Sequence, residues 1–305
     1  MTSKFEANYS SNTDANPKSG FETIVMANCI LNAPLMLLSI LGNALVLVAI
    51  LRTPSIHSPS VIFLCNLAVT DLLVGLVVQP AYIAQQIVRT VSALQEAVTA
   101  MGFAGCGVSL WTMTAITVDR FLALHCHLQY PNLRTTSRAI YTIVTIWCII
   151  MLFTFSFIWS PSIYHYFVAT FGITICLLVN LVCFIKIYRI VRRHQLQIHV
   201  QQQAVENSID TNKQQIRQST RKAKNIFIYF LAMILCYSPF SIAVFISGFT
   251  SIDLKVVATF SLTVVLMNSS INPFLFCWRM TELRAAVFKT VKLFSCRETD
   301  ERVLT

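Results

Sequence analysis

Long runs of apolar residues alternate with short polar stretches along most of the chain. Each run reaches the roughly 20 residues that an α-helix needs to cross a bilayer. Pro, Gly and polar residues inside the runs are typical of membrane helices that pack against one another. The pattern predicts an all-α membrane protein, a bundle of seven transmembrane helices. The seven runs lie near 24–51, 60–88, 97–124, 139–161, 166–188, 226–249 and 256–278.

Two segments with a different pattern come after the fifth and the seventh runs. The polar stretch 192–222 either extends two helices into water or has no fixed structure. After the seventh run, apolar residues recur at helical spacing with basic residues between them, which predicts an amphipathic helix along the inner leaflet. We therefore divide the chain into an extracellular tail (1–22), the bundle (23–279), the amphipathic helix (280–295) and a cytoplasmic tail (296–305).

Composition and charge fix the compartment and the orientation. Only 12% of the 305 residues are charged, whereas soluble domains carry about 25%. The net charge is +10, and only four of the 23 Lys and Arg fall outside if the N-terminus is extracellular: Lys4, Lys18, Arg89 and Lys255. The positive-inside rule then predicts a multi-pass plasma-membrane protein with its C-terminus in the cytoplasm. Because the basic residues flank the spans, we expect no nucleic-acid partner.

Three further features concern processing and covalent chemistry. The first 20 residues are polar and the first apolar run is long enough to span, so we expect a signal anchor. Asn8 begins an Asn-Tyr-Ser glycosylation sequon on the outer side. Cys296, just after the amphipathic helix, is either palmitoylated or a free cytosolic thiol. Of the ten cysteines only Cys29 lies near the outer face, so we expect no structural extracellular disulfide.

A single carboxylate, Asp71, lies inside the second apolar run. Placing a charge at that depth costs at least about 2.5 kcal/mol on insertion scales. The helical rise places several hydroxyl and amide side chains of other runs at a similar depth. Asp71 is either protonated and hydrogen-bonded, or ionised around a small hard cation with oxygen ligands. The candidate partners are Ser109, Asn268, Ser269 and Asn272, with Asn43 as a fifth.

Two other motifs indicate moving parts. Asp119 and Arg120 close the third run at its inner end, where the arginine is either a topogenic anchor or a switch that changes partner. Pro239 in the sixth run and Pro273 in the seventh each remove a backbone hydrogen bond, so both are expected to act as hinges.

Together these motifs resemble the rhodopsin-like (class A) G-protein-coupled receptors, over residues 24 to 296. Residues 119–139 look most like adenosine receptors, whereas the very short second outer loop looks like melanocortin receptors. The motifs are "GN" at 42–43, "NLAVTD" at 66–71, "DRF" at 119–121, Trp147, "CYSP" at 236–239, "NPFLF" at 272–276 and the amphipathic helix.

The resemblance implies a cell-surface receptor that converts binding of an extracellular ligand into activation of a heterotrimeric G protein. Its partners are then the ligand, the G protein and membrane lipids. The resemblance also implies an allosteric sodium ion, which favours the inactive state, held by Asp71, Ser109, Asn268, Ser269 and Asn272. The implied G-protein coupling switch comprises Asp119, Arg120, Phe121, Tyr188 and Phe276.

The chain departs from the family pattern at this switch. The usual Asp-Arg-Tyr is Asp-Arg-Phe, and the last tyrosine of the seventh span is Phe276, which leaves Tyr188 without a hydroxyl partner. Many members hold the arginine with an acid at the foot of span six, but this chain has no acid between Asp210 and Asp253. With only Asp119 to restrain Arg120, we predict raised basal activity.

The expected ligand cavity is apolar and neutral. Gly102 stands where amine receptors carry an aspartate, and Leu266 where opsins carry the retinal lysine. Gln79, Gln86 and Glu96 are expected near the rim. An apolar cavity with few polar groups suits a lipid-like or small neutral ligand. The expected lining is Gly102, Phe103, Cys106, Tyr237, Phe240, Ser241, Val244 and Leu262.

Other classes fit the sequence less well. A transporter or channel would show internal repeats or a charged route, and neither is present. A membrane enzyme needs a converging nucleophile, base or metal cluster, which the spread-out histidines do not provide. A signalling-silent receptor with degenerate switches is the nearest alternative.

Overall fold

A computed structural model describes the backbone of residues 17–53, 59–88, 92–125, 136–204, 209–250 and 255–303. Within it, side chains are described for 22–53, 61–88, 93–125, 136–193, 228–250, 256–278 and 280–292. Seven helices in this part are long and apolar enough to cross a membrane, which confirms the predicted bundle. They cover Glu22–Leu51, Val61–Val88, Ala93–His125, Thr136–Trp159, Ile163–Arg193, Ile228–Phe249 and Val256–Trp278.

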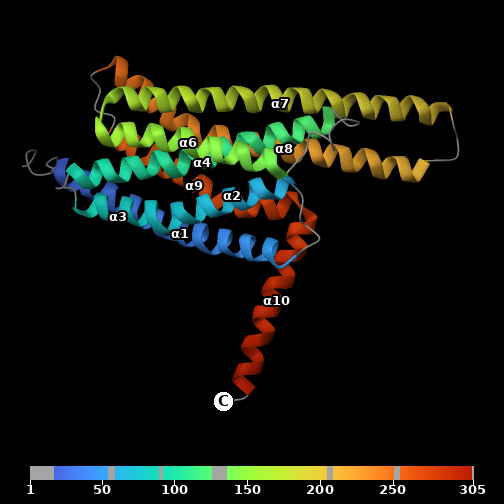
Figure 1. The fold of residues 1–305 in the computed structure, drawn as a ribbon, viewed down its shortest axis with the longest axis horizontal. Coiled ribbons are helices and arrows are strands. Elements are labelled where there is room, and N and C mark those ends of the chain that lie inside the picture. The colour runs from blue at the N-terminus through green and yellow to red at the C-terminus, as the bar shows by residue number, and fades with distance from the viewer. Residues whose placement is uncertain are drawn as a thin grey trace, which may run out of the picture.

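The spans lie side by side with their axes roughly parallel (Figure 1). α4 (Ser92–His125) packs against α2 (Pro59–Leu73), α6 (Thr136–Trp159) and α7 (Ile163–Ala204). α9 (Lys255–Arg279) packs against α1 (Pro17–Leu51) and α8 (Ile209–Phe249). The backbone of 192–204 and of 209–222 is helical. α7 and α8 therefore extend side by side beyond the other helices at one end (Figure 1).

The second span is interrupted close to Asp71. A π-helical turn, η2 (Val74–Val78), separates α2 from α3 (Gln79–Val88) within this one span. Such bulges shift the register of the side chains after them and are frequent at functional sites. Gly75 in this turn is buried against α1, where an added Cβ would lie 3.1 Å from Ser39 Oγ. The small residue therefore lets the two helices approach closely.

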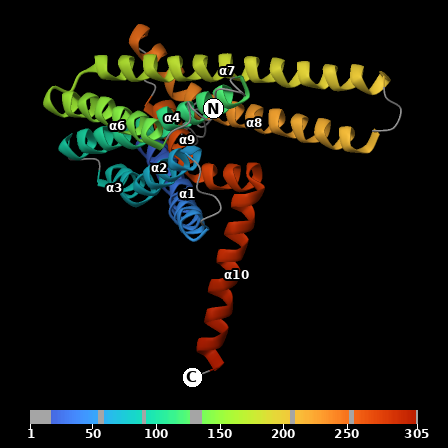
Figure 2. The ribbon, with the colours of Figure 1, turned by 45° about the vertical axis from the view of Figure 1, so that its right-hand side comes forward.

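The helix after the seventh span leaves the bundle sideways. α10 (Thr281–Val303) crosses the direction of the spans in two views (Figure 1, Figure 2). Leu283 and Ala286 are buried against the bundle, whereas Arg284, Lys289 and also Phe288 are exposed. An amphipathic helix that lies along a membrane surface stays a prediction. The helix is longer than the predicted 280–295 and includes the backbone of Cys296, whose side chain lies outside the described residues.

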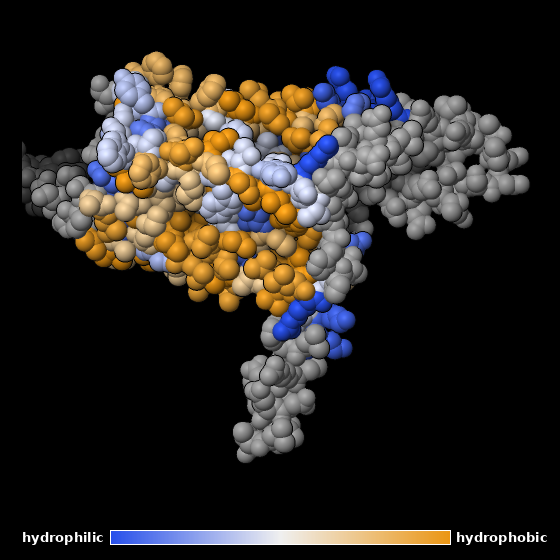
Figure 3. Space-filling view, in the orientation of Figure 1, coloured by the Kyte–Doolittle hydropathy of each residue, from blue (hydrophilic) through white to orange (hydrophobic). Residues whose placement is uncertain are grey.

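The outer surface of the bundle matches a lipid environment. Apolar residues cover most of the visible side of the spans, and strongly hydrophilic ones gather where α7 and α10 leave it (Figure 3). Leu152, Phe155 and Phe171 are between 63% and 71% exposed, which would be costly in water. The chain is thus a multi-pass membrane protein. Asn8 lies outside the described residues.

Candidate functional site

The carboxylate of Asp71 is the centre of a buried polar cluster that joins three spans. Its Oδ1 accepts hydrogen bonds from Ser109 Oγ at 2.9 Å and from Ser269 Oγ at 2.7 Å. Its Oδ2 accepts a bond from Asn272 Nδ2 at 2.7 Å. All four side chains are almost fully buried. Bonds to a carboxylate are stronger than neutral ones, so the cluster ties α2, α4 and α9 together.

Asn268 and Asn43 lie near this cluster with other partners. Asn268 Nδ2 lies 3.4 Å from the hydroxyl oxygen of Tyr237 and 3.5 Å from Met113 Sδ. Asn43 Nδ2 donates to the backbone carbonyls of Ser39 and Ser269. The sequence therefore identified three of the direct partners of Asp71 and two residues that bond elsewhere.

Asn43 donates a hydrogen bond to a backbone carbonyl that the proline of α9 leaves without a helical partner. Pro273 has no backbone N–H, so the carbonyl of Ser269, four residues earlier, loses its helical partner. Asn43 Nδ2 supplies the missing donor at 3.0 Å. The bend-prone part of α9 is thereby fixed to α1, next to the two α9 residues that bond Asp71.

The cluster has the chemistry of a site for a small hard cation. Hard cations prefer oxygen ligands, and Asp71, Ser109 and Ser269 present carboxylate and hydroxyl oxygens within one cluster. The Oδ1 of Asn272 is buried without a hydrogen-bond partner among the described residues. In the described part of the chain, no three His, Cys, Asp or Glu side chains gather. One carboxylate among neutral oxygens therefore fits a monovalent ion such as Na⁺ better than a transition metal.

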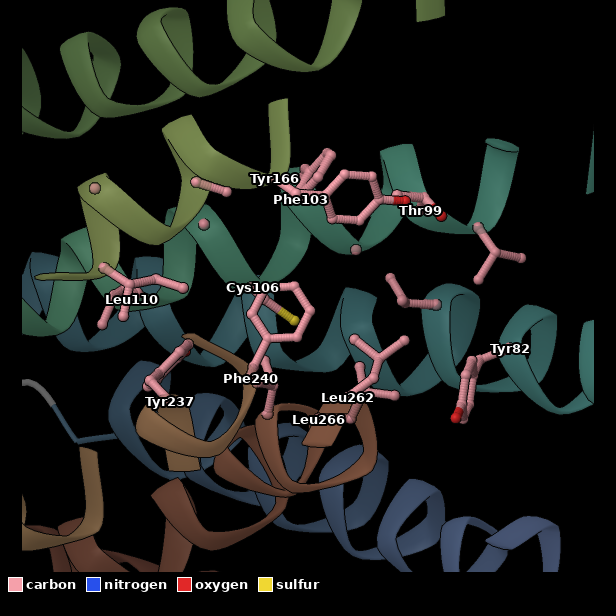
Figure 4. Close-up of a pocket in the computed structure, with 18 of the residues that line it drawn as sticks. Tyr82, Thr99, Phe103, Cys106, Leu110, Tyr166, Tyr237, Phe240, Leu262 and Leu266 are labelled. Atoms are coloured by element: carbon pink, nitrogen blue, oxygen red, sulfur yellow. The ribbon is translucent and has the colours of Figure 1, made fainter. Parts of the chain in front are cut away.

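A cavity of about 390 Å³ lies between the spans, with Tyr237 in its lining. Residues of α4, including Phe103, Cys106 and Leu110, face Tyr237 and Phe240 of α8 and Leu262 of α9 across it (Figure 4). None of the described residues that line it is charged. The polar groups of its lining include Tyr82, Gln85, Gln86, Gln95, Thr99 and Tyr166.

The predicted lining is present with two exceptions. Gly102, Phe103, Cys106, Tyr237, Phe240 and Leu262 all line the cavity. Ser241 and Val244 do not: Ser241 Oγ bonds the backbone carbonyl of Tyr237, and Val244 is buried elsewhere. They follow Tyr237 by four and seven residues, so they lie along the same face of α8 but nearer its Phe249 end, beyond the part that lines the cavity.

The expected rim residues also differ. Of Gln79, Gln86 and Glu96, only Gln86 lines the cavity. Glu96 is exposed on α4. Gln79 is completely buried because it comes directly after the π-helical turn, which changes the face on which later residues lie.

An aromatic cluster that the sequence analysis missed forms the wall between α6 and α7. Phe103 makes edge-to-face contacts with Phe153, Phe157 and Tyr166, at centroid distances of 5.3, 5.3 and 5.5 Å. His165 Nε2 lies 3.2 Å from Ser156 Oγ, so the two helix ends are also joined by a polar contact. Only residues 160–162 connect the helices, which agrees with the short outer loop expected from the sequence. The many Phe residues gave no signal of this pairing.

At the His125 end of α4, the residues of the predicted coupling switch lie in a mixed environment. Arg120 is partly buried, and its Nε has no hydrogen-bond partner within the described residues. Phe121 packs against Ile187 and Val191 of α7, and Lys186 Nζ lies 5.3 Å from its ring centroid. A cation near an aromatic ring is attracted by its negative face. Phe121 therefore holds the inner ends of α4 and α7 together.

The structure gives Tyr188 and Phe276 different partners. Tyr188 is 50% exposed on α7, and its ring lies 6.3 Å from that of Phe184. Phe276 is buried on α9 and stacks on Tyr229 of α8 at 5.7 Å. Tyr229 was missed as a contact of the switch because no motif marks it in the sequence. The stacked pair joins the inner halves of α8 and α9.

Comparison with known proteins agrees with this architecture. The family described as 7 transmembrane receptor (rhodopsin family) matches residues 42–161 and 154–276. Melanocortin receptor 4 of Danio rerio is 26% identical, over 85% of this chain and 81% of that receptor. Trace amine-associated receptor 7f of Mus musculus is 26% identical, over 83% and 79%. Cannabinoid receptor 1 of Xenopus laevis is 24% identical, over 81% of this chain and 59% of that receptor.

The match spans all seven helices in order and includes the carboxylate cluster, the Asp-Arg-Phe motif and the α9 proline. The resemblance drawn from the motifs alone is therefore confirmed. This chain belongs to the rhodopsin family of seven-transmembrane receptors, the rhodopsin-like G-protein-coupled receptors.

Proposed function

We propose that this receptor lies in the plasma membrane and activates a heterotrimeric G protein when a small neutral or lipid-like ligand enters the cavity beside Tyr237. The N-terminus is extracellular and the C-terminus cytoplasmic. The basic residues of α7 and α10 support this orientation. α7, which carries Arg192 and Arg193, extends beyond the bundle at the same end from which α10, with Lys289 and Lys292, departs (Figure 1).

The observation that carries the ligand class is the chemistry of the cavity wall. Val98, Phe103, Phe153, Leu262 and other apolar side chains dominate it, and its described lining contains no ionised group. A charged ligand would lose its hydration there without a counter-ion, at a cost of several kcal/mol. A neutral ligand with one or two polar groups can bond the glutamines, while its apolar part fills the remainder.

The names of the relatives do not decide among ligands. They refer to a melanocortin, a trace amine and a cannabinoid receptor, at nearly equal identity to this chain. An amine would need a carboxylate, whereas Gly102 lies at the matching position, with nothing within 4 Å of a Cβ built on it. The space beside Gly102 instead supports an uncharged ligand.

We further propose that Na⁺ binds at Asp71 and favours the inactive arrangement. When bound, the ion supplies the positive charge that keeps the carboxylate ionised at membrane depth. Asp71, Ser109, Ser269 and Asn272 would hold the ion through their side-chain oxygens, and Asn272 Oδ1 has no hydrogen-bond partner among the described residues. Movement of α9 relative to α4 would separate these groups, so that binding of the ion and rearrangement of the spans oppose each other.

The test measures G-protein nucleotide exchange in membranes that contain the full chain. A panel of neutral single-chain lipids is compared with amines and acidic peptides. A responding compound is then applied to Gly102→Leu, whose side chain extends into the cavity. We expect a loss of potency of at least about tenfold, roughly 1.4 kcal/mol of binding free energy.

Ala97→Leu is the matched control, because Ala97 is exposed on the same helix and does not line the cavity. Its potency should equal that of the native receptor. A response restricted to amines or acidic peptides, or an equal potency in Gly102→Leu, would overturn the proposed ligand class.

A further inference from the structure

A second buried polar cluster lies at the outer ends of α1, α3 and α9. Asn28 Nδ2 donates to the hydroxyl of Tyr82 at 2.9 Å, and Tyr82 donates to the carbonyl of Thr259 at 3.1 Å. Thr263 Oγ1 donates to Asn28 Oδ1 at 2.7 Å and accepts a bond from Asn32 Nδ2 at 2.9 Å. Since Tyr82 and Thr259 also line the ligand cavity, the cluster begins at the cavity wall.

One helical turn further inward, two amide side chains have polar atoms without a hydrogen-bond partner within the described part of the chain. Gln79 is 0% exposed, and neither its Nε2 nor its Oε1 has a hydrogen-bond partner among the described residues. Asn32 is also 0% exposed, and its Oδ1 has none there either. Buried amides of this kind are rare because a lost hydrogen bond is expensive in an apolar interior.

The two amides lie at the same depth in adjacent helices. α1 and α3 run in opposite directions, and the Asn28–Tyr82 bond fixes their register. Asn32 lies four residues inward from Asn28, and Gln79 lies three residues inward from Tyr82, so both are displaced from the bonded pair by about one turn. Further inward again, Ser39 Oγ bonds the backbone carbonyl of Asp71 at 2.9 Å.

The atoms without partners, on Gln79 and Asn32, are the donor and acceptor groups that a buried water molecule bonds. Gln79 contributes an NH₂ donor and a carbonyl acceptor, and Asn32 contributes a second acceptor, all of them buried. A buried water molecule commonly makes about three hydrogen bonds to such groups. We propose that ordered water occupies a site between Asn32 and Gln79. The site continues the cluster of Asn28, Tyr82 and Thr263 inward, so a hydrated polar file runs from the wall of the ligand cavity toward the level of Asp71.

This file differs from the direct line between the cavity and Asp71. On that side the cavity is lined by the apolar Cys106, Leu110 and Leu266, and the hydroxyl of Tyr237 lies 3.4 Å from Asn268 Nδ2. The amides and hydroxyls along α1, α3 and α9 form a second, separate polar file. The inference rests on neither the ligand nor the sodium ion proposed above.

The first test is a structure of the full chain in a lipid nanodisc, at a resolution that shows ordered water. Density for water within hydrogen-bond distance of Gln79 and Asn32 Oδ1 is the expected result. A direct hydrogen bond between the two side chains, or a dry gap between them, would overturn the proposal.

The second test asks whether Gln79→Leu raises or lowers the apparent melting temperature of the receptor. If the site is dry, Gln79→Leu removes an unsatisfied amide and raises the apparent melting temperature. If it holds water, the same change leaves the water and Asn32 Oδ1 short of partners, and the melting temperature falls by about 2–4 °C. Glu96→Leu, which replaces an exposed polar side chain of α4 outside the cavity lining, is the control and should change it little. A higher melting temperature for Gln79→Leu would exclude the hydrated site.

Discussion

At the scale of single residues, the site depends on one carboxylate whose partners come from distant parts of the sequence. Ser109, Ser269 and Asn272 together supply three donors to Asp71. A group buried at this depth is stable only when its lone pairs are occupied. The bonding explains why an acid is retained in an otherwise apolar helix.

Asp71→Asn tests whether this cluster binds Na⁺. In the native receptor, Na⁺ at ten times its dissociation constant should add about 1.4 kcal/mol to the free energy of unfolding. The substitution removes the only charge of the cluster, so this stabilisation should disappear. The measurement is the apparent melting temperature in sodium chloride and in choline chloride at equal concentration. Glu282→Gln, at an exposed acid on α10, should keep the full sodium effect. An equal sodium effect in Asp71→Asn would contradict the assignment.

At the scale of helices, close approach of backbones fixes the geometry. A Cβ on Gly42 would lie 2.8 Å from the Cγ of Pro273, so α1 and α9 touch at the point where the proline interrupts α9. The same proline frees the carbonyl that Asn43 bonds. Gly42, Asn43 and Pro273 therefore act as one joint between the two helices.

Gly42→Ala should loosen this joint. The added methyl group clashes with the Pro273 ring, and overpacking of this kind typically costs about 1–3 kcal/mol. The apparent melting temperature of the receptor should fall accordingly.

Gly102→Ala is the matched control, because nothing lies within 4 Å of its new Cβ and alanine favours a helix by up to about 1 kcal/mol. Equal melting temperatures for the two variants would show that the α1–α9 contact is not tight.

At the same scale, the sequence predicted which segments form the membrane helices. It misplaced individual side chains, mainly where a helix changes the direction in which its side chains point. Hydrophobic runs of membrane length identify helices well because no other open structure satisfies its backbone in lipid. Gln79 was misplaced because the π-helical turn at Val74–Val78 leaves no mark in the composition. Ser241 and Val244 were misplaced because a linear spacing does not show where the face of a helix leaves a cavity.

At the scale of the whole molecule, the receptor contains a cavity, a buried carboxylate cluster and an inner arginine along one bundle. Asp71, Ser109, Ser269 and Asn272 could be grouped from depth and motif together, whereas the partners of Asn268 and Tyr229 required coordinates. A motif predicts which residues are present, but side-chain directions depend on packing across helices. The inner arginine, whose Nε lacks a partner among the described residues, is the part that faces the G protein in our proposal.

The most direct test of the account is G-protein activation without ligand, measured by nucleotide exchange across a panel of G-protein subtypes. The native chain is compared with Arg120→Ala and Asp71→Asn at matched surface expression. We predict basal exchange above background on at least one subtype, its loss in Arg120→Ala and a changed level in Asp71→Asn. Exchange at background level for the native chain, or exchange that is unaffected by Arg120→Ala, would contradict the central claim.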